Sequence, residues 1–208
     1  MNYLQPSEYE NYTLESTTPA SLVNAASALI DGHCRRPTLS VQQYSERVRV
    51  RPGRNTVRLT YLPLQAVAPS STAIVSARGR LGVPRRGEEN DGTGLTAASV
   101  VFGLPGTWTA IDVASLEYCA ETGEVSIASH LFGLSFTEIE ITYTAGLDTI
   151  PDGVKFACAQ IVKNAQTTPG LNVKSGSLDR MQVSYFSDSL VDATVRAMLA
   201  PYVAQKLG

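Results

Sequence analysis

The apolar positions of the chain follow a helical period near both ends and a strand period between them. Over residues 19–34, apolar residues recur every three or four positions, which predicts a helix. Thr18 is placed to cap its N-terminus, and Pro19 takes the first helical position, where a missing N–H costs nothing. Arg35 and Arg36 put cations at its C-terminal end. The stripe expected to be buried consists of Leu22, Ala26, Leu29, Ile30 and His33.

Residues 38–146 alternate between apolar and polar side chains, a pattern typical of strands. Val48 and Val50 precede the turn residues Pro52 and Gly53, and a second alternating run follows, so the sequence predicts a hairpin here. Residues 77–94 lack apolar periodicity and are rich in glycine and charge, so we expect a long mobile loop or arm. The other predicted strands cover residues 73–77, 98–102, 115–119, 124–128 and 136–144.

Helical periodicity returns after Gly146. A helix is predicted to start at Ile150-Pro151-Asp152 and to end at residues 167–170. Ser187 or Asp188 is predicted to cap a final helix, which Pro201 kinks or ends. The buried stripe of the first of these helices is predicted to be Val154, Ala157, Cys158, Ile161 and Ala165. That of the last is predicted to be Leu190, Val191, Thr194, Val195, Met198 and Leu199.

The segment between these helices, residues 171–186, is polar and rich in serine and glycine. At its end Met181, Val183 and Tyr185 alternate with polar residues, which predicts an edge strand. An unpaired edge strand recruits another chain, so this strand is predicted to pair with a partner protein or a neighbouring copy. Pairing within its own chain is the alternative, and the sequence leaves both open.

The order of predicted elements indicates an α+β fold, a small α-helical bundle of about three helices with a large inserted antiparallel β module. None of the helices is long enough to be stable alone, so they must pack together. Both ends of the β segment then lie at one place. We predict an N-terminal segment and first helix over residues 1–37, the inserted β-rich module over 38–146, and the remaining helices over 147–208.

Composition is that of an ordered globular protein. The chain has 208 residues, of which 43% are hydrophobic and 17% are charged. No apolar run reaches the roughly 18 residues that a membrane helix needs, and the N-terminus does not resemble a signal peptide, so we expect no membrane association. The three cysteines are far apart and odd in number, which predicts buried free thiols in a reducing compartment.

The net charge of −2 hides a strong segregation of charge along the chain. Residues 35–86 contain eleven arginines and one acidic residue, Glu46, whereas residues 87–152 contain eleven acidic residues and no lysine or arginine. A protein that only binds DNA rarely carries such an acidic block beside its basic one. Self-complementary contact, within one chain or between copies, would explain both blocks.

Candidate catalytic chemistry is sparse. The two histidines, His33 and His130, lie where packing or capping roles are expected, and no nucleophile motif accompanies them. No spacing suits a metal ion or a phosphate-binding loop, so the sequence predicts no catalytic residue, cofactor or metal site. Glu138 and Glu140 share one face of a predicted strand. We interpret them as part of a solvated or interface face, and paired catalytic carboxylates are the less favoured alternative.

The arginine-rich stretch over residues 47–58 is the basic feature with the clearest functional implication. Its arginines at alternate positions share one strand face, opposite Val48 and Val50. Two interpretations remain open, a solvated face or a surface directed toward an acidic partner or DNA phosphates. The predicted interface residues are therefore Arg47, Arg49, Arg51, Glu138, Glu140, Met181, Val183 and Tyr185.

Several stretches together resemble the head–tail connector (adaptor) proteins of tailed bacteriophages. They are the alanine-rich helix with its basic end (ASLVNAASALIDGHCRRP), VRLTYLPLQAV, YCAETGEVSIA, ITYTAGLDTIPDGVKFACAQIVKNA and the terminal LAPY. The fourth stretch is fairly specific, and the others match at the level of pattern. The resemblance spans most of residues 18–203.

This resemblance implies a non-enzymatic structural protein of the virion neck, made in the host cytoplasm. Such proteins form a ring, usually of twelve copies, that binds the portal and continues the DNA channel toward a stopper or tail-completion protein. The helical bundle forms the ring and inserted β modules decorate it. Contact with DNA would be transient and non-specific. Two alternatives are a β-rich decorating or carbohydrate-binding module and a hydrolase of unrecognised type.

Overall fold

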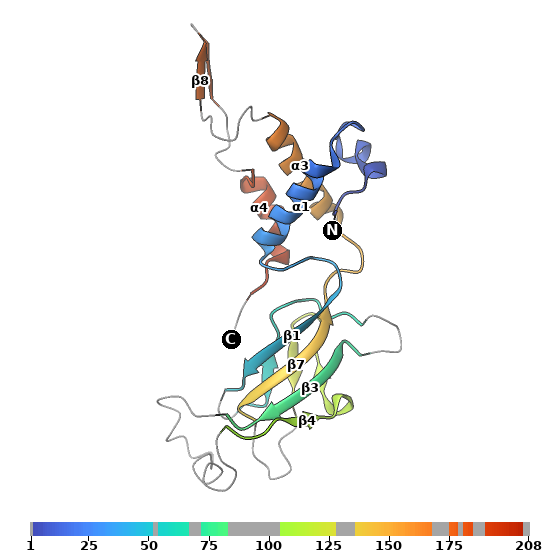
Figure 1. Ribbon diagram of the computed structural model, residues 1–208, viewed down its shortest axis with the longest axis vertical. Helices are drawn as coiled ribbons and strands as arrows, with labels where there is room; N and C mark the ends of the chain where they lie inside the picture. Colours follow the sequence, from blue (N-terminus) through green and yellow to red (C-terminus); the bar gives the residue numbers. More distant parts are fainter. Residues whose placement is uncertain are drawn as a thin grey trace. The chain divides into compact units, whose positions relative to one another are not determined.

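The computed structural model has an α+β architecture with two compact units, which confirms the predicted fold class (Figure 1). The first unit comprises Met1–Leu39 and Thr149–Ala204, and the second is built on Ser40–Asp148. The second unit thus interrupts the first in sequence; the insertion predicted from the sequence runs over residues 38–146. The structure describes residues 2–51, 54–66, 72–82, 105–127, 136–167, 175–178, 181–184 and 190–205.

Three helices form the first unit, α1 (Ala20–Cys34), α3 (Asp152–Thr167) and α4 (Ala193–Leu199). Each packs against the other two. Their shared core is apolar and almost fully removed from solvent, as expected for helices that cannot persist alone. Its members are Val23, Ala26, Ile30, Val154, Ala157, Cys158, Ile161, Val195 and Leu199.

Helix α1 differs from its prediction in its cap and in its buried face. Pro19 occupies the N-cap position, and Thr18 is buried instead of capping the helix. The buried residues are Val23, Ala26, Ser27, Ile30 and Cys34. Leu29 is 39% exposed, so the stripe is rotated by about one position from the predicted one. Burial of Ser27 is possible because its hydroxyl donates to the Val23 carbonyl oxygen at 2.8 Å.

The N-terminal segment lies against α1 and α3. It contains two short 3₁₀ turns, Pro6–Glu8 and Glu10–Tyr12. The Tyr12 hydroxyl donates to Asp152 Oδ1 at 2.7 Å, and Lys155 forms an ion pair with Glu8. Its large side chains complete the core of this unit because they are buried, namely Tyr3, Leu4, Tyr9, Tyr12 and Leu14.

Helix α3 agrees with its prediction more closely than helix α4 does. Helix α3 starts at Asp152 and buries four of its five predicted stripe residues; Ala165 is only partly buried. Helix α4 starts at Ala193 and is capped by Asp192, which accepts from the Val195 N–H at 2.8 Å, not by Ser187 or Asp188. Only Val195 and Leu199 of this seven-residue helix are buried, and Met198 is 36% exposed. A short helix turns only one i, i+4 pair toward the core.

The second unit contains two antiparallel sheets (Figure 1). The larger has the order β1-β7-β3-β4, with strands Gln42–Arg49, Glu138–Ala145, Ile74–Arg80 and Thr109–Ile111. The smaller has the order β2-β6-β5, with strands Thr56–Arg58, Glu124–Ser126 and Glu117–Tyr118. A 3₁₀ turn, Val113–Ser115, precedes β5. Both sheets contribute to one core, whose most deeply buried members include Val125, Ile139, Ile141 and Tyr143.

The predicted hairpin over residues 47–58 is wrong. Strand β1 pairs along its whole length with β7, and β2 pairs with β6 in the other sheet. Val57 on β2 and Val125 on β6 lie opposite each other and are both buried in the common core. The chain therefore passes between sheets at the predicted turn, because each strand gains a long-range partner that buries its apolar face.

Strand β3 continues to Arg80, into the stretch predicted as an arm. The inward positions at this end are the small residues Ala77 and Gly79, which gave no apolar period in the sequence. At Gly79 a side chain is impossible without rearrangement, since a Cβ atom would lie 2.5 Å from Cγ of Phe136. The predicted strand over residues 98–102 and the rest of the arm, residues 83–94, lie outside the described residues.

The chain enters and leaves the second unit at one place. Ser40 forms a parallel bridge with Leu147, which lies two residues after the end of β7. Gly146, the residue between β7 and Leu147, has φ +136°, and a Cβ atom there would lie 2.4 Å from the Ser40 carbonyl oxygen. Only glycine fits this close backbone crossing. The stretch of residues 141–165 is therefore a strand, a glycine crossing and then α3.

Two further strands, β8 (Ser175–Leu178) and β9 (Met181–Ser184), form an antiparallel pair. Met181 is opposite Leu178, and Val183 is opposite Gly176. The strand predicted at Met181 and Val183 therefore has a partner in its own chain, and of the two interpretations the structure shows pairing within the chain.

Among the described helices, none is long and apolar enough to cross a membrane.

Candidate functional site

Charged residues on the larger sheet form two rows across three strands. The strand register places Glu140 of β7 between Arg47 of β1 and Arg78 of β3. One step along the same face, Glu138 lies between Arg49 and Arg80. Because residues at i and i+2 of a strand share a face, all of these side chains project from the same side of the sheet. Each row therefore places one carboxylate between two arginines.

Hydrogen-bonded ion pairs connect these side chains. Glu138 Oε2 accepts from Arg47 Nη2 at 2.5 Å and from Arg80 Nε at 2.7 Å. Glu140 Oε1 accepts from Nε and Nη2 of Arg78 at 3.0 and 2.6 Å. Arg47 thus reaches diagonally to the carboxylate of the neighbouring row, which links the two rows. Charge-assisted bonds of this length are among the stronger side-chain interactions in proteins.

Trp108, the only tryptophan of the chain, lies among the guanidinium groups. The guanidinium carbons of Arg47, Arg78 and Arg80 lie 5.4, 5.1 and 4.6 Å from the centre of its indole ring. Each distance is within the range of a cation–π interaction. Trp108 comes immediately before β4, so pairing of β4 with β3 brings the indole to this face. We call this surface the arginine–tryptophan face; its members are Arg47, Arg49, Arg78, Arg80, Trp108, Glu138 and Glu140.

Exposure and charge are uneven across the face. The side chains of Arg47 and Arg78 are 51% and 50% exposed, whereas those of Arg80 and Glu138 are 17% and 15% exposed. Burial of Glu138 opposes its ionisation, but hydrogen bonds from Arg80 and Arg47 outweigh burial and hold its pKa below the ordinary value of 4.5. Counting the described residues, the face has four arginines and two glutamates, so positive charge exceeds negative charge there.

The structure brings four predicted interface residues, Arg47, Arg49, Glu138 and Glu140, into this face. Arg51 lies beyond the end of β1 and is exposed. Tyr185 lies outside the described residues, whereas Met181 and Val183 lie in β9. The basic and acidic blocks of the sequence meet here within one chain, since Arg47, Arg78 and Arg80 all pair with glutamates of β7.

Sequence reasoning missed Trp108, Arg78 and Arg80. The sequence predicts a loop at Arg78 and Arg80 because their inward neighbours are too small to give a strand signal. Arginine at alternate positions, which also marks β1, is a signal that could have identified this strand. Trp108 is brought to the face only by the pairing of β4 with β3, and no local pattern predicts that pairing.

Other clusters in the described residues offer less chemistry. No group of three metal-ligating side chains occurs among them. His33 is partly buried on α1, and His130 lies outside the described residues. Cys34 and Cys158 are buried, as predicted, but Cys119 is exposed in the turn before β6, which corrects the prediction for that thiol.

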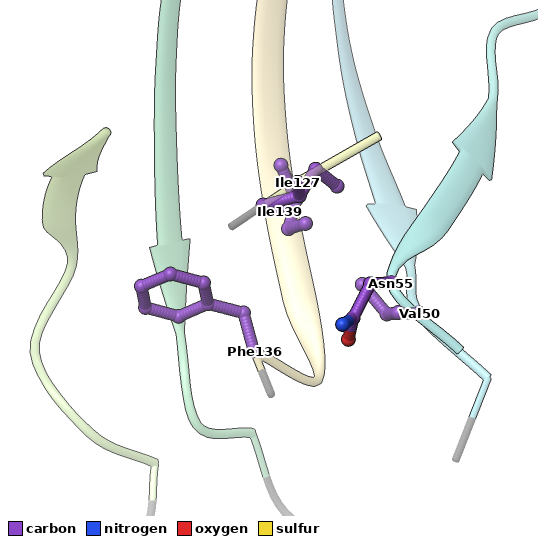
Figure 2. A pocket seen from close by; sticks show the side chains of 5 residues that line it. All are labelled: Val50, Asn55, Ile127, Phe136 and Ile139. Atoms are coloured by element: carbon purple, nitrogen blue, oxygen red, sulfur yellow. The ribbon is translucent and has the colours of Figure 1, made fainter. Parts of the chain in front are cut away.

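A small pocket lies at one end of the β core. Figure 2 shows its lining side chains, which are Val50, Asn55, Ile127, Phe136 and Ile139. Its volume of about 10 Å³ has room for a single water molecule and for no larger ligand. Four of the five side chains are apolar, so the pocket offers no acid–base pair.

A second polar cluster ties the N-terminus to the helical unit. The Tyr3 hydroxyl donates to Asp31 Oδ1 and accepts from the Leu39 N–H at 2.7 Å. Burial raises the pKa of Tyr3 and that of Asp31. Both groups are engaged by their neighbours and by the backbone, so the cluster is a structural connection between the N-terminal segment, α1 and Leu39.

Comparison of the chain with protein-family models and with curated proteins finds no match.

Proposed function

We propose that this protein is a structural component of a tailed-bacteriophage virion, a head–tail connector that forms a ring between portal and tail. The observation that carries the proposal is the interruption of a helical unit by the β unit Ser40–Asp148. The family that the sequence resembles has this arrangement, with a helical ring body and inserted β modules. On this proposal the protein is not an enzyme, and it continues the DNA channel in the neck of the virion.

The surface of α1 supports contact with another protein chain. Its exposed positions are occupied by alanine, serine, asparagine, leucine and glycine and include no charged side chain. Leu29 is the largest of them and is 39% exposed. A charge-free surface of this kind is typical of the centre of a protein interface. We propose that it packs against a neighbouring copy or the portal; a downstream stopper or tail-completion protein is the third expected partner.

The carbohydrate-binding alternative is less well supported. Such a site would display a flat aromatic ring to solvent, but three guanidinium groups lie within 5.4 Å of the Trp108 ring centre. The hydrolase alternative would need a pocket with an acid–base pair. The small pocket of Figure 2 has no such pair among its lining residues.

Assembly with the portal protein tests the proposal. Purified protein is mixed with the portal of the same virus, and the products are measured by mass photometry and negative-stain electron microscopy. We expect a ring, of about twelve copies as in the resembled family, stacked on the portal. A chain that stays monomeric at micromolar concentration, with and without the portal, would contradict the proposed function.

A variant pair locates the contact. Leu29→Asp places a charge on the exposed face of α1 and should reduce ring formation by at least about tenfold, while the monomer stays folded. Val75→Asp is the matched control, because Val75 is 53% exposed in the β unit. Equal assembly of the two variants would show that the α1 surface is not an interface.

A further inference from the structure

We propose that the arginine–tryptophan face binds the phosphodiester backbone of double-stranded DNA without sequence preference. The choice of DNA over other polyanions rests on the proposed function, which places the chain beside a DNA channel. The site itself is argued from the charge, the hydrogen-bond donors and the rigidity of the face.

The face carries more positive than negative charge. Among the described residues, Arg47, Arg78 and Arg80 share it with the carboxylates of Glu138 and Glu140, and Arg49 lies in the same row as Glu138. Positive charge on a protein surface neutralises phosphates and releases their counterions, which is the main source of non-specific DNA affinity. The whole chain has a net charge of −2, so the positive charge of this face is local, and a local positive field attracts anions.

Hydrogen-bond donors are also in excess. Each guanidinium group has five N–H donors. Arg47, Arg78 and Arg80 make four hydrogen bonds to the two glutamates. Within the part of the chain that the structure describes, these bonds use a minority of the donors, which leaves others for an acceptor from outside the chain. Arg47 and Arg78 are half exposed, so their guanidinium groups are the ones that a phosphate oxygen can reach.

Neighbouring side chains hold these arginines in place. Glu138 bonds to both Arg47 and Arg80, and the Trp108 ring lies within 5.4 Å of three guanidinium carbons. Arginines that are fixed before binding lose less conformational freedom when a ligand binds, which favours affinity. Trp108 and Glu138 are thus positioning residues for Arg47, and Trp108 and Glu140 are positioning residues for Arg78.

The geometry favours contact with phosphate over contact with bases. A guanidinium group offers two parallel N–H donors, which match two oxygens of a phosphate. Three guanidinium carbons lie within 5.4 Å of the Trp108 ring centre and compete with a base for stacking on this ring. Phosphate contacts position a protein on DNA but carry no sequence information, so we expect binding without sequence preference.

Fluorescence anisotropy of a labelled 30-base-pair duplex tests the proposal with the full chain, between 50 and 200 mM salt. We expect binding that weakens with salt and is equal, within about twofold, for a second duplex of unrelated sequence. The double variant Arg47→Gln/Arg78→Gln should bind at least about tenfold more weakly at 50 mM salt. Its slope of log affinity against log salt should fall by about 1.8, since each phosphate contact contributes about 0.9.

Two further double variants control for total charge and for folding. Arg54→Gln/Arg58→Gln removes the same charge from exposed positions of the same unit, outside the face, and should keep the wild-type slope. Arg47→Lys/Arg78→Lys retains the charge and should keep most of the slope, even if the glutamine variant proves unstable. Equal losses in the Arg54/Arg58 and Arg47/Arg78 glutamine variants would overturn the proposal, as would an unchanged slope in the latter.

Trp108 gives an independent readout, because it is the only tryptophan in the chain. DNA binding at the face should change its fluorescence with the same dissociation constant as the anisotropy signal. Binding that leaves this fluorescence unchanged would place the DNA elsewhere and overturn the proposal. Displacement of the duplex by poly-glutamate of equal charge at a lower concentration would assign the face to an acidic protein partner instead, and would also overturn it.

Portal assembly of the same variants separates this inference from the proposed function. Arg47→Gln/Arg78→Gln protein that joins the ring but no longer binds DNA would support both. Wild-type protein that binds DNA through the face without forming a ring would contradict the proposed function and still support the DNA-binding site. A ring-forming protein that does not bind the duplex would overturn the site alone.

Discussion

Glu138 is the residue that links the two rows of the arginine–tryptophan face. Its carboxylate accepts from Arg47 and from Arg80 and is only 15% exposed. Because these bonds lower its pKa in the folded state, the ionised form stabilises the fold above the unfolded-state pKa. That contribution is lost as the pH falls through the folded-state value, which lies below 4.5.

Glu138→Gln should therefore destabilise the protein in a pH-dependent way. We expect a loss of about 1–2 kcal/mol in the free energy of unfolding at pH 7, since charge-assisted hydrogen bonds are replaced by weaker ones. The difference from wild type should shrink as the pH falls through the lowered folded-state pKa, where the wild-type carboxyl also becomes protonated. Urea unfolding at pH 7 and at a series of acidic pH values measures it. Glu140→Gln, at a more exposed carboxyl, should cost less; a pH-independent loss at Glu138 would contradict this account.

Gly79 is a second residue whose identity is set by its surroundings. Gly79→Ala would place a Cβ atom 2.5 Å from the buried Phe136 ring, so we expect a loss of about 1–3 kcal/mol in the free energy of unfolding. Gly153→Ala is the matched control, because nothing lies within 4 Å of its Cβ position in α3. That variant should be neutral or stabilised by up to about 1 kcal/mol. The free energies of unfolding are measured by thermal or urea unfolding. Equal changes in the two variants would show that the Phe136 ring moves aside at little cost.

At the scale of elements, adjacent residues of α1 test which face of the helix is buried. Ile30 is fully buried and Leu29 is 39% exposed. Ile30→Ala should cost about 2–5 kcal/mol in the free energy of unfolding, and Leu29→Ala less than about 1 kcal/mol. Urea unfolding of the two variants under identical conditions gives the comparison. Equally large losses at the two positions would instead support the stripe predicted from the sequence, in which both Leu29 and Ile30 are buried.

Helix positions were predictable because α1 and α3 have their own periodic patterns and helix-starting residues. The rotation of the α1 stripe was not, because Ser27 is buried only through a hydrogen bond to the Val23 carbonyl. Strand pairing was harder still. The alternation of β1 predicts a strand, but its partner β7 lies almost a hundred residues away, and only the assembled core selects it.

The candidate site was predictable only in part, for the same reason. Arg47, Glu138 and Glu140 were recognisable as one-sided charged strand faces. They come together with Arg78, Arg80 and Trp108 because β3 lies between β7 and β4 in the sheet. No local sequence pattern predicts this strand order.

At the scale of the whole molecule, the β unit should be removable. Ser40 and Leu147 are bridge partners, so a short linker can replace Ser40–Asp148. The shortened chain should keep the helices α1, α3 and α4, because their buried side chains contact one another. Circular dichroism at 222 nm and a cooperative thermal transition measure this. A shortened chain without helical signal would show that the helical unit depends on the β unit.

The bridge between Ser40 and Leu147 also has a kinetic consequence. Helices α1 and α3 are separated by residues 35–151, and the entropy lost on closing such a loop grows with the logarithm of its length. Once the β unit has folded, its two ends are held together and the effective loop is only a few residues long. This difference lowers the cost of bringing α1 to α3 by about 2–3 kcal/mol. The β unit should therefore fold first, at a rate limited by the long-range pairing of β1 with β7, and the helices should dock afterwards.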